Sequence, residues 1–288
     1  MPLPSSGIIR ISDIRTELNN TSCSLTCLSL IAGKSAPHAM SEFYGYSAAV
    51  SAGYKYGSPQ LTFDFAQTSY YSNSGTSIAD LSGNSNNGTF STGTGNGTPA
   101  TVTGYSSSGY LSLPGDGNQR SVRIPDSLKP SGNNAFSFVV HMRPKGYSYN
   151  GNYPGIMAHG DSTLGLSWYI NPDQNGQAVW RDLNSGDNGF TYLAYSGGAG
   201  FNVWSTYFLT SSGYNQTVYQ YYSGTRYASS TVATNRGITV QSGWGFFLGL
   251  RYNQWINADI SYVAIYNSQL SATDVSNIGA ALSSRAPS

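Results

Sequence analysis

The stretch that most constrains the fold of this chain runs from residue 244 to residue 278. Residues 246–251 carry a large apolar side chain at every second position, and residues 258–266 repeat this alternation after a turn-like segment, so each run predicts a β-strand. The expected buried face of the first strand is Phe246, Leu248 and Leu250. Ser271 is a good helix N-cap, and the apolar residues behind it recur at helical spacing, namely Val275, Ile278 and Leu282. This stretch therefore predicts two strands followed by a helix.

The composition favours many short strands. Of the 288 residues, 34 are Gly and 23 are Tyr, and only 9% are charged, which suits strands joined by tight turns. A net charge of +1 without any cluster of Lys and Arg argues against a nucleic-acid partner. No apolar run reaches the roughly eighteen residues of a membrane span, and the start MPLPSSG lacks the basic and apolar regions of a secretory signal.

Four segments, in this order along the chain, carry the motifs of one known family. They are DLSGNSNNGTF at 80–90, GYLSLPGDGNQRSVRIP at 109–125, FSFVVHMRPK at 136–145 and NADISYVAIYNSQLSATDV at 257–275. These segments resemble the first loop, a strand pair, the long central strand and the closing segment of laminin G-like, concanavalin A-type domains. The resemblance implies a mainly β protein, an antiparallel β-sandwich of the jelly-roll type. Further strands are expected at 61–65, 164–170, 177–183, 204–212 and 216–224.

Residues 1–47 differ from the rest and predict a small helical module. In ISDIRTEL, Ser12 is expected to cap a helix, and a second short helix is expected at 25–32. The apolar face of the first helix would consist of Ile11, Ile14 and Leu18. Residues 40–43 repeat the pattern of a hydroxyl residue followed by an acidic one. Because so small a segment buries little apolar surface, we expect its apolar residues to need a partner.

Three stretches of this module carry specific motifs: PLPSSG at 2–7, ISDIRTEL at 11–18 and SEFYG at 41–45. They resemble the N-terminal module of bacteriophage and prophage virion proteins. The resemblance implies that residues 1–47 anchor the chain to a phage particle, that 48–60 form a linker and that 61–288 form the displayed sandwich. The residues expected to dock are Ile11, Ser12, Asp13, Ile14, Leu18, Phe43 and Tyr44. The alternative is a helical cap on the sandwich of the same chain.

Catalytic carboxylate pairs, which glycosidases use as acid and base, are not expected in the sandwich. The chain contains only two Glu, Glu17 and Glu42, and both lie in the N-terminal module. His141 and Arg143 on one expected strand, with His159 nearby, are similar to the arrangement of jelly-roll polysaccharide lyases, but the Q-(I/V)-H and Y-x-K-x-G-x-Y motifs of those families are missing. We therefore expect an ordinary hydrogen-bonded His141 and no enzymatic activity.

Calcium is the cofactor to consider, because many proteins of the resembled family hold one ion through loop oxygens. Asp80 and Asn84 in the 80–90 loop, and Asp259 on the closing strand, carry the oxygen ligands that this hard cation prefers. Asn and Asp also form tight turns without a metal, so no cofactor is certain.

Aromatic residues with polar neighbours are the candidates for sugar binding, since sugar rings pack on flat aromatic surfaces. The candidates are Trp168, Tyr169, Trp180, Arg181 and Tyr192. Tyr and Trp also fill sheet positions and anchor protein interfaces, so packing and protein contact remain alternatives.

Together these features predict a structural protein of the phage virion whose sandwich binds a cell-surface or mucus-like glycan during adsorption. The expected partners are capsid or tail proteins and the glycan, with a homo-oligomer or many copies on each particle to add up weak contacts. Two alternatives remain open. One is a capsid decoration or head fibre protein with a purely structural sandwich, and the other is a tail-associated polysaccharide depolymerase.

Overall fold

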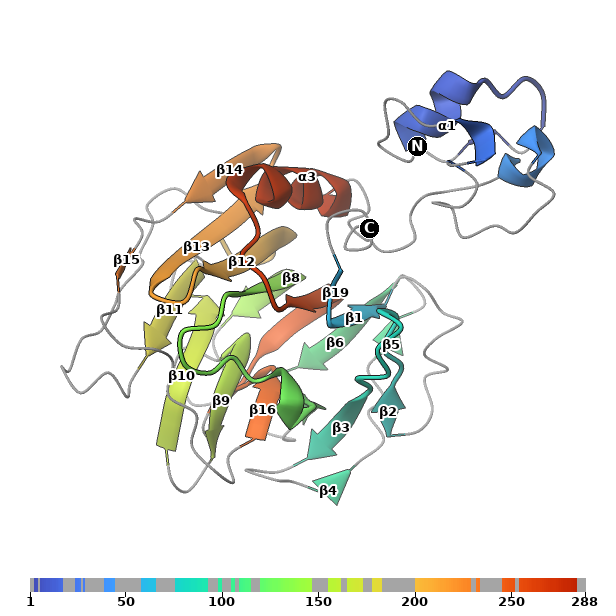
Figure 1. The fold of residues 1–288 in the computed structure, drawn as a ribbon. Coiled ribbons are helices and arrows are strands. Elements are labelled where there is room, and N and C mark those ends of the chain that lie inside the picture. The colour runs from blue at the N-terminus through green and yellow to red at the C-terminus, as the bar shows by residue number, and fades with distance from the viewer. Residues whose placement is uncertain are drawn as a thin grey trace. The chain divides into compact units, whose positions relative to one another are not determined.

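The computed structural model divides the chain into two compact units, Met1–Gly57 and Ser58–Ser288 (Figure 1). The division falls inside the stretch 48–60 that we expected to be a linker. The residues that the structure describes are 3–4, 6–17, 24–26, 28, 39–44, 58–65, 76–92, 98–99, 105–106, 109–114, 120–146, 155–161, 165–172, 178–182, 200–228, 232–233, 245–251 and 254–283. Within these ranges, no helix has the length and apolar character that a membrane crossing requires.

The N-terminal unit contains helix α1 (Ile11–Glu17) and the 3-10 helix η1 (Met40–Phe43). The prediction that Ser12 caps the first helix is wrong, because α1 begins one residue earlier. Asp13 Oδ2 accepts a hydrogen bond from the backbone N–H of Arg10 at 2.8 Å, so an acidic side chain in the first turn satisfies the backbone there. The helix η1, by contrast, begins without a side-chain cap.

This unit has a small core of its own. Its buried residues are Leu3, Ile14, Leu28 and Phe43, with Ile9, Leu25 and Met40 packed against them. The expectation that Ile14 and Phe43 dock directly on a particle is corrected here, because both are completely buried and support the unit from inside. Leu18, another expected docking residue, lies outside the described ranges, as does most of the expected helix at 25–32.

The second unit is a sandwich of two antiparallel sheets (Figure 1), which confirms the predicted fold class. The strands of sheet A are β1 (Leu61–Asp64), β5 (Tyr105–Ser106), β6 (Tyr110–Pro114), β8 (Phe136–Gly146), β12 (Ser205–Ser211), β13 (Asn215–Tyr222), β14 (Thr225–Ala228), β15 (Val232–Ala233) and β19 (Asn257–Tyr266). Their order is β14-β13-β12-β8-β19-β6-β5, with β1 also beside β19 and β15 beside β13.

Sheet B faces sheet A across the core. Its strands are β2 (Ser77–Ile78), β3 (Gly88–Thr92), β4 (Thr98–Pro99), β7 (Arg120–Ile124), β9 (Met157–Asp161), β10 (Gly165–Pro172), β11 (Ala178–Asp182) and β16 (Gly245–Leu248). Their order is β11-β10-β9-β16-β7-β3-β2, with β4 beside β3. A separate hairpin joins β17 (Leu250–Arg251) to β18 (Gln254–Trp255), and a 3-10 helix, η4 (Asp126–Leu128), follows β7.

β19 is hydrogen-bonded along both edges. β8 pairs with its whole length. On the other edge, β6 pairs with residues 257–260 and β1 with residues 262–265. The pairing with β8 shifts twice, and the surplus residues are Ser261 on β19 and Lys145 on β8. Two β-bulges therefore lie in the middle of sheet A.

The strand predicted at 246–251 is interrupted. β16 is followed by Gly249 at a φ of +81°, a conformation that residues with a Cβ rarely adopt. Phe246 and Leu248 lie in the main core, as predicted. Leu250 instead belongs to a second cluster with Phe247 and Trp255, because the chain changes face at the glycine.

Helix α3 (Ala272–Ser283) packs on the outer face of sheet A, over β12, β13 and β14 (Figure 1). Ser271 caps it as predicted, since its Oγ accepts a hydrogen bond from the N–H of Asp274 at 3.1 Å. Asp274 Oδ2 in turn accepts one from the N–H of Ser271 at 2.9 Å, which completes a capping box. The predicted apolar face is buried against the sheet and comprises Val275, Ile278 and Leu282.

A Gly279→Ala substitution tests how closely α3 packs. Alanine favours a helix interior over glycine by about 1 kcal/mol, but a Cβ at this position would lie 2.3 Å from Cγ of the Tyr221 ring. We expect overpacking to prevail and the free energy of unfolding in urea to fall by about 1–3 kcal/mol. The control is Ala280→Gly, at an exposed position of the same helix, which should cost at most about 1 kcal/mol. A more stable Gly279→Ala protein would contradict the packing described here.

Candidate functional site

Away from α3, the outer face of sheet A carries a group of polar and aromatic side chains that we call the outer-face cluster. Side chains alternate along each strand, so the residues between the core positions of β8 point to this face. The cluster comprises Tyr110 and Ser112 from β6, His141, Arg143 and Lys145 from β8, Trp204 immediately before β12, Thr206 from β12, and Asp259 from β19. Adjacent hydrogen-bonded strands therefore position these side chains.

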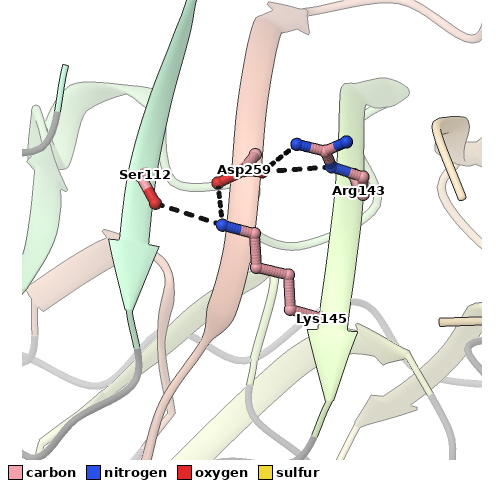
Figure 2. Close-up of polar contacts among 4 residues, drawn as sticks. All are labelled: Ser112, Arg143, Lys145 and Asp259. Atoms are coloured by element: carbon pink, nitrogen blue, oxygen red, sulfur yellow. Dashed lines mark hydrogen bonds and ion pairs between the residues drawn. The ribbon is translucent and has the colours of Figure 1, made fainter. Parts of the chain in front are cut away.

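A buried carboxylate, Asp259, lies at the centre of the cluster. The register places it between Ser112 on β6 and Arg143 on β8. Arg143 donates to Asp259 Oδ2 from Nε at 3.1 Å and from Nη2 at 2.7 Å (Figure 2). Lys145 Nζ lies 2.6 Å from Asp259 Oδ1 and 3.4 Å from Ser112 Oγ. Two cations thus neutralise a carboxylate that would be strongly destabilising if it were buried alone.

Two aromatic rings flank this ion-pair group. Tyr110 lies on β6 and Trp204 immediately before β12, on opposite sides of β19 and β8, yet their ring centroids are only 5.8 Å apart, in an edge-to-face arrangement. Arg143 Cζ lies 5.7 Å from the Tyr110 centroid and 5.2 Å from the Trp204 centroid, within cation–π range. Both rings are partly exposed, so part of this aromatic surface is accessible to solvent.

His141 supports the Trp204 ring. The two rings are stacked with centroids 5.3 Å apart and planes 17° apart, and His141 Nδ1 lies 2.9 Å from Thr206 Oγ1. His141 is buried, so it has the hydrogen-bonded position on a sheet face that the sequence predicted. His159, its neighbour in the lyase-like arrangement, lies on β9 of sheet B with Nδ1 3.1 Å from the Gly245 carbonyl oxygen, and burial lowers its pKa. The two histidines therefore belong to different sheets.

Comparison with known proteins identifies the family of the sandwich. A laminin G-like model of the concanavalin A-like lectin/glucanases superfamily matches residues 116–276, more than half of the chain. The chain belongs to this superfamily. No curated protein matches it in sequence.

Solved structures of similar fold include domain 4 of a GH43 extracellular arabinanase from Geobacillus stearothermophilus, determined in complex with arabinotriose. It is 15% identical, with a TM-score of 0.54, over 78% of this chain and 99% of that domain. A Trypanosoma rangeli sialidase mutant that displays trans-sialidase activity is 15% identical, with a TM-score of 0.50, over 78% of this chain. The match spans only 32% of the sialidase. At these identities the likeness shows the concanavalin A-like fold.

The predicted sugar-binding residues of this lectin-like sandwich lie elsewhere, at the β10–β11 edge of sheet B. The register pairs Trp168 with Asp182, Tyr169 with Arg181 and Ile170 with Trp180. On its other edge β10 pairs with β9, where Ile170 lies opposite Met157. Tyr192 lies outside the described ranges. A sugar-binding role for these residues stays a prediction.

The sequence did not predict the outer-face cluster. The signal in β8 was the alternation of His141, Arg143 and Lys145 with apolar residues, which indicates one polar face on an otherwise apolar strand. Tyr110 and Trp204 join this face only through strand pairing between distant segments. A single sequence does not specify that pairing.

Of the three residues considered for calcium, Asp80 and Asn84 share a hydrogen-bond partner, Ser82 Oγ, in their own loop, whereas Asp259 lies on β19. Asp80 holds its own loop: Oδ1 accepts hydrogen bonds from the N–H groups of Thr62 and Ser82, and Oδ2 accepts from Ser82 Oγ and the N–H of Asn86. Four donors fill the acceptor sites of a carboxylate. Asn84 Nδ2 donates to the Pro59 carbonyl at 3.0 Å. Asp259 is paired with two cations, and no group of three or more acidic, His or Cys residues suited to a metal occurs in the described ranges.

An Asp80→Asn substitution tests the loop. An amide places an N–H₂ group where two donors already point, so we expect the free energy of unfolding to fall by about 2–4 kcal/mol in urea. The matched control is Asp126→Asn, in a half-exposed ion pair, which should change stability by no more than about 1 kcal/mol. Addition of Ca²⁺ or a chelator should leave the melting temperature of the unmodified chain unchanged. A Ca²⁺-dependent rise that Asp80→Asn abolishes would support a metal site instead.

Proposed function

We propose that the sandwich binds carbohydrate at the outer-face cluster. The observation that carries this proposal is the pair of partly exposed rings, Tyr110 and Trp204, held over the fixed Arg143–Asp259 pair. Sugar recognition needs a flat apolar surface beside polar groups of fixed direction, and this arrangement supplies both. Membership in a superfamily of lectins and glucanases supports the proposal, as does the arabinotriose bound to the arabinanase domain of similar fold.

The proposed activity is binding without cleavage. Glycosidases of the paired-carboxylate type need two carboxyl groups about 5–10 Å apart. Both Glu residues of this chain are in the N-terminal unit, and the cluster contains one carboxylate, which already carries two cations. Release of reducing ends or unsaturated uronates from a polysaccharide would favour the depolymerase alternative.

The chain as a whole is proposed to be a virion protein of a bacteriophage, attached through its N-terminal unit. The motif resemblance of residues 1–47 is the main support. The exposed apolar residues add to it, because three of the four large ones in the described ranges lie in this unit: Ile8, Ile11 and Tyr44, exposed by 81%, 40% and 44%. Tyr44 Oη donates to the carbonyl of Gly7, the residue before Ile8, at 2.6 Å. We propose that these exposed apolar side chains supply the surface that meets a protein partner. Many copies on each particle would combine weak sugar contacts into firm adsorption.

Tyr110→Ala and Trp204→Ala test the carbohydrate proposal. We expect each variant to lose affinity about tenfold or more on a glycan array that includes arabino-oligosaccharides, because each removes a flat contact surface. Tyr214→Ala is the control, since Tyr214 is 47% exposed and lies outside the cluster. Circular dichroism verifies folding of each variant. Equal binding by all three variants would place the sugar site elsewhere.

An Ile8→Asp/Ile11→Asp double variant tests the attachment proposal in the full chain. We expect its amount in purified particles to fall at least tenfold, because charged side chains oppose burial in an apolar interface. Tyr214→Asp, which changes an exposed residue of the sandwich, should be incorporated normally. Quantitative mass spectrometry of the particles measures both. Normal incorporation of the double variant would exclude docking through this surface.

A further inference from the structure

We infer that the outer-face cluster selects anionic carbohydrate, that is, sugars bearing an oxyanion such as a carboxylate or a sulfate. The inference rests on the proposed function, because it assigns a chemical class of ligand to the same surface. Its basis is the charge balance of the cluster, its spare hydrogen-bond donors and the way in which these donors are fixed.

The charges of the cluster are unequal in number and in exposure. Arg143 and Lys145 share the single carboxylate of Asp259, which leaves one positive charge in excess. The Asp259 side chain is 0% exposed, whereas those of Arg143 and Lys145 are 26% and 33% exposed. A ligand therefore meets the cations and not the carboxylate. Because both cations are partly buried, water screens them less than it screens a fully exposed charge.

Both cations have donors to spare. Arg143 uses Nε and Nη2 for Asp259, and its Nη1 has no recorded partner within the described ranges. The Lys145 ammonium has three N–H donors, and its recorded contacts are Asp259 and the more distant Ser112 Oγ. Guanidinium and ammonium groups form charge-assisted hydrogen bonds with oxyanions, and the planar guanidinium suits the two oxygens of a carboxylate or sulfate.

These donors are already fixed before any ligand binds. Asp259 holds the two cations through its two oxygens, and the rings of Tyr110 and Trp204 hold the Arg143 guanidinium. A preorganised site loses little side-chain entropy when a ligand arrives. The ligand that fits places its oxyanion on Arg143 and Lys145 and a face of its sugar ring on the aromatic surface.

A second ion-pair group provides an internal comparison. On sheet B and the adjoining η4 segment, Asp126 pairs with Arg123 at 3.3 Å and with Lys129 at 3.2 Å. The composition is the same, but this Asp side chain is 50% exposed, and no aromatic ring is recorded beside Arg123 in the described ranges. The Arg123 and Lys145 side chains are both 33% exposed. Arg123→Gln therefore removes one positive charge from a side chain of the same exposure that lacks the rings.

The experiment measures binding of the full chain by biolayer interferometry to immobilised polygalacturonate, its methyl ester, dextran sulfate and dextran. We expect binding to polygalacturonate or dextran sulfate and at least tenfold weaker binding to the neutral counterpart of each. Lys145→Gln should weaken binding about tenfold, the worth of one charge-assisted hydrogen bond. Lys145→Arg, which keeps the positive charge, should bind about as tightly as the unmodified chain. Arg123→Gln should leave binding unchanged. The charged polymer that binds identifies the oxyanion.

Equal binding to each charged polymer and its neutral counterpart would overturn the inference, and that comparison requires no variant. Equal losses in Lys145→Gln and Arg123→Gln would also overturn it, since they would indicate general electrostatic attraction. Melting curves verify that each variant is folded. If the chain binds neutral glycans of the array and neither charged polymer, this inference fails and the proposed function stands. If it binds no glycan at all, both fail.

Discussion

Hydrogen bonding on both edges of β19 is the constraint on which the sandwich depends. β8 covers one edge, and β6 and β1 share the other, so strands from the start, middle and end of the unit meet at one place. The inner side chains of β19 join the core, and its outer side chains include Asp259. Because β19 lies late in the sequence, the middle of sheet A cannot form until most of the chain is present. Such non-local pairing is typical of slowly folding β proteins.

The sequence allowed correct prediction wherever a local signal decides the structure. The alternation in 258–266, the Ser271 cap and the helical spacing of Val275, Ile278 and Leu282 each act within a few residues, and the structure contains β19 and α3 there. The errors arose where two local signals compete or where a distant partner decides. Helix α1 begins at Ile11, before the expected cap Ser12, with Asp13 accepting from the N–H of Arg10, and Gly249 reverses the face of Leu250. The outer-face cluster depends on strand pairing over more than a hundred residues, for which the sequence carries no local sign.

The ion-pair group of the cluster is a weak source of stability. Replacement of a buried ion pair by apolar side chains of similar volume often leaves stability unchanged or raises it, whereas loss of one partner is strongly destabilising. Apolar residues at these positions could therefore hold sheet A together, as the apolar face of α3 does at the other end of the sheet. A charged group flanked by two partly exposed rings is easier to understand as a recognition surface than as a means of holding strands together.

The two bulges in sheet A have a further consequence. Each of the paired strands carries one surplus residue, Ser261 on β19 and Lys145 on β8, so the shift that one introduces is cancelled by the other. Only the three pairs between them are displaced, and the middle pair is Asp259 with Arg143. A one-residue deletion in either strand would leave the other surplus uncompensated and would bring inward-facing residues opposite outward-facing ones along half of the sheet. Insertions and deletions are therefore expected to be tolerated here only in matched pairs, one in each strand.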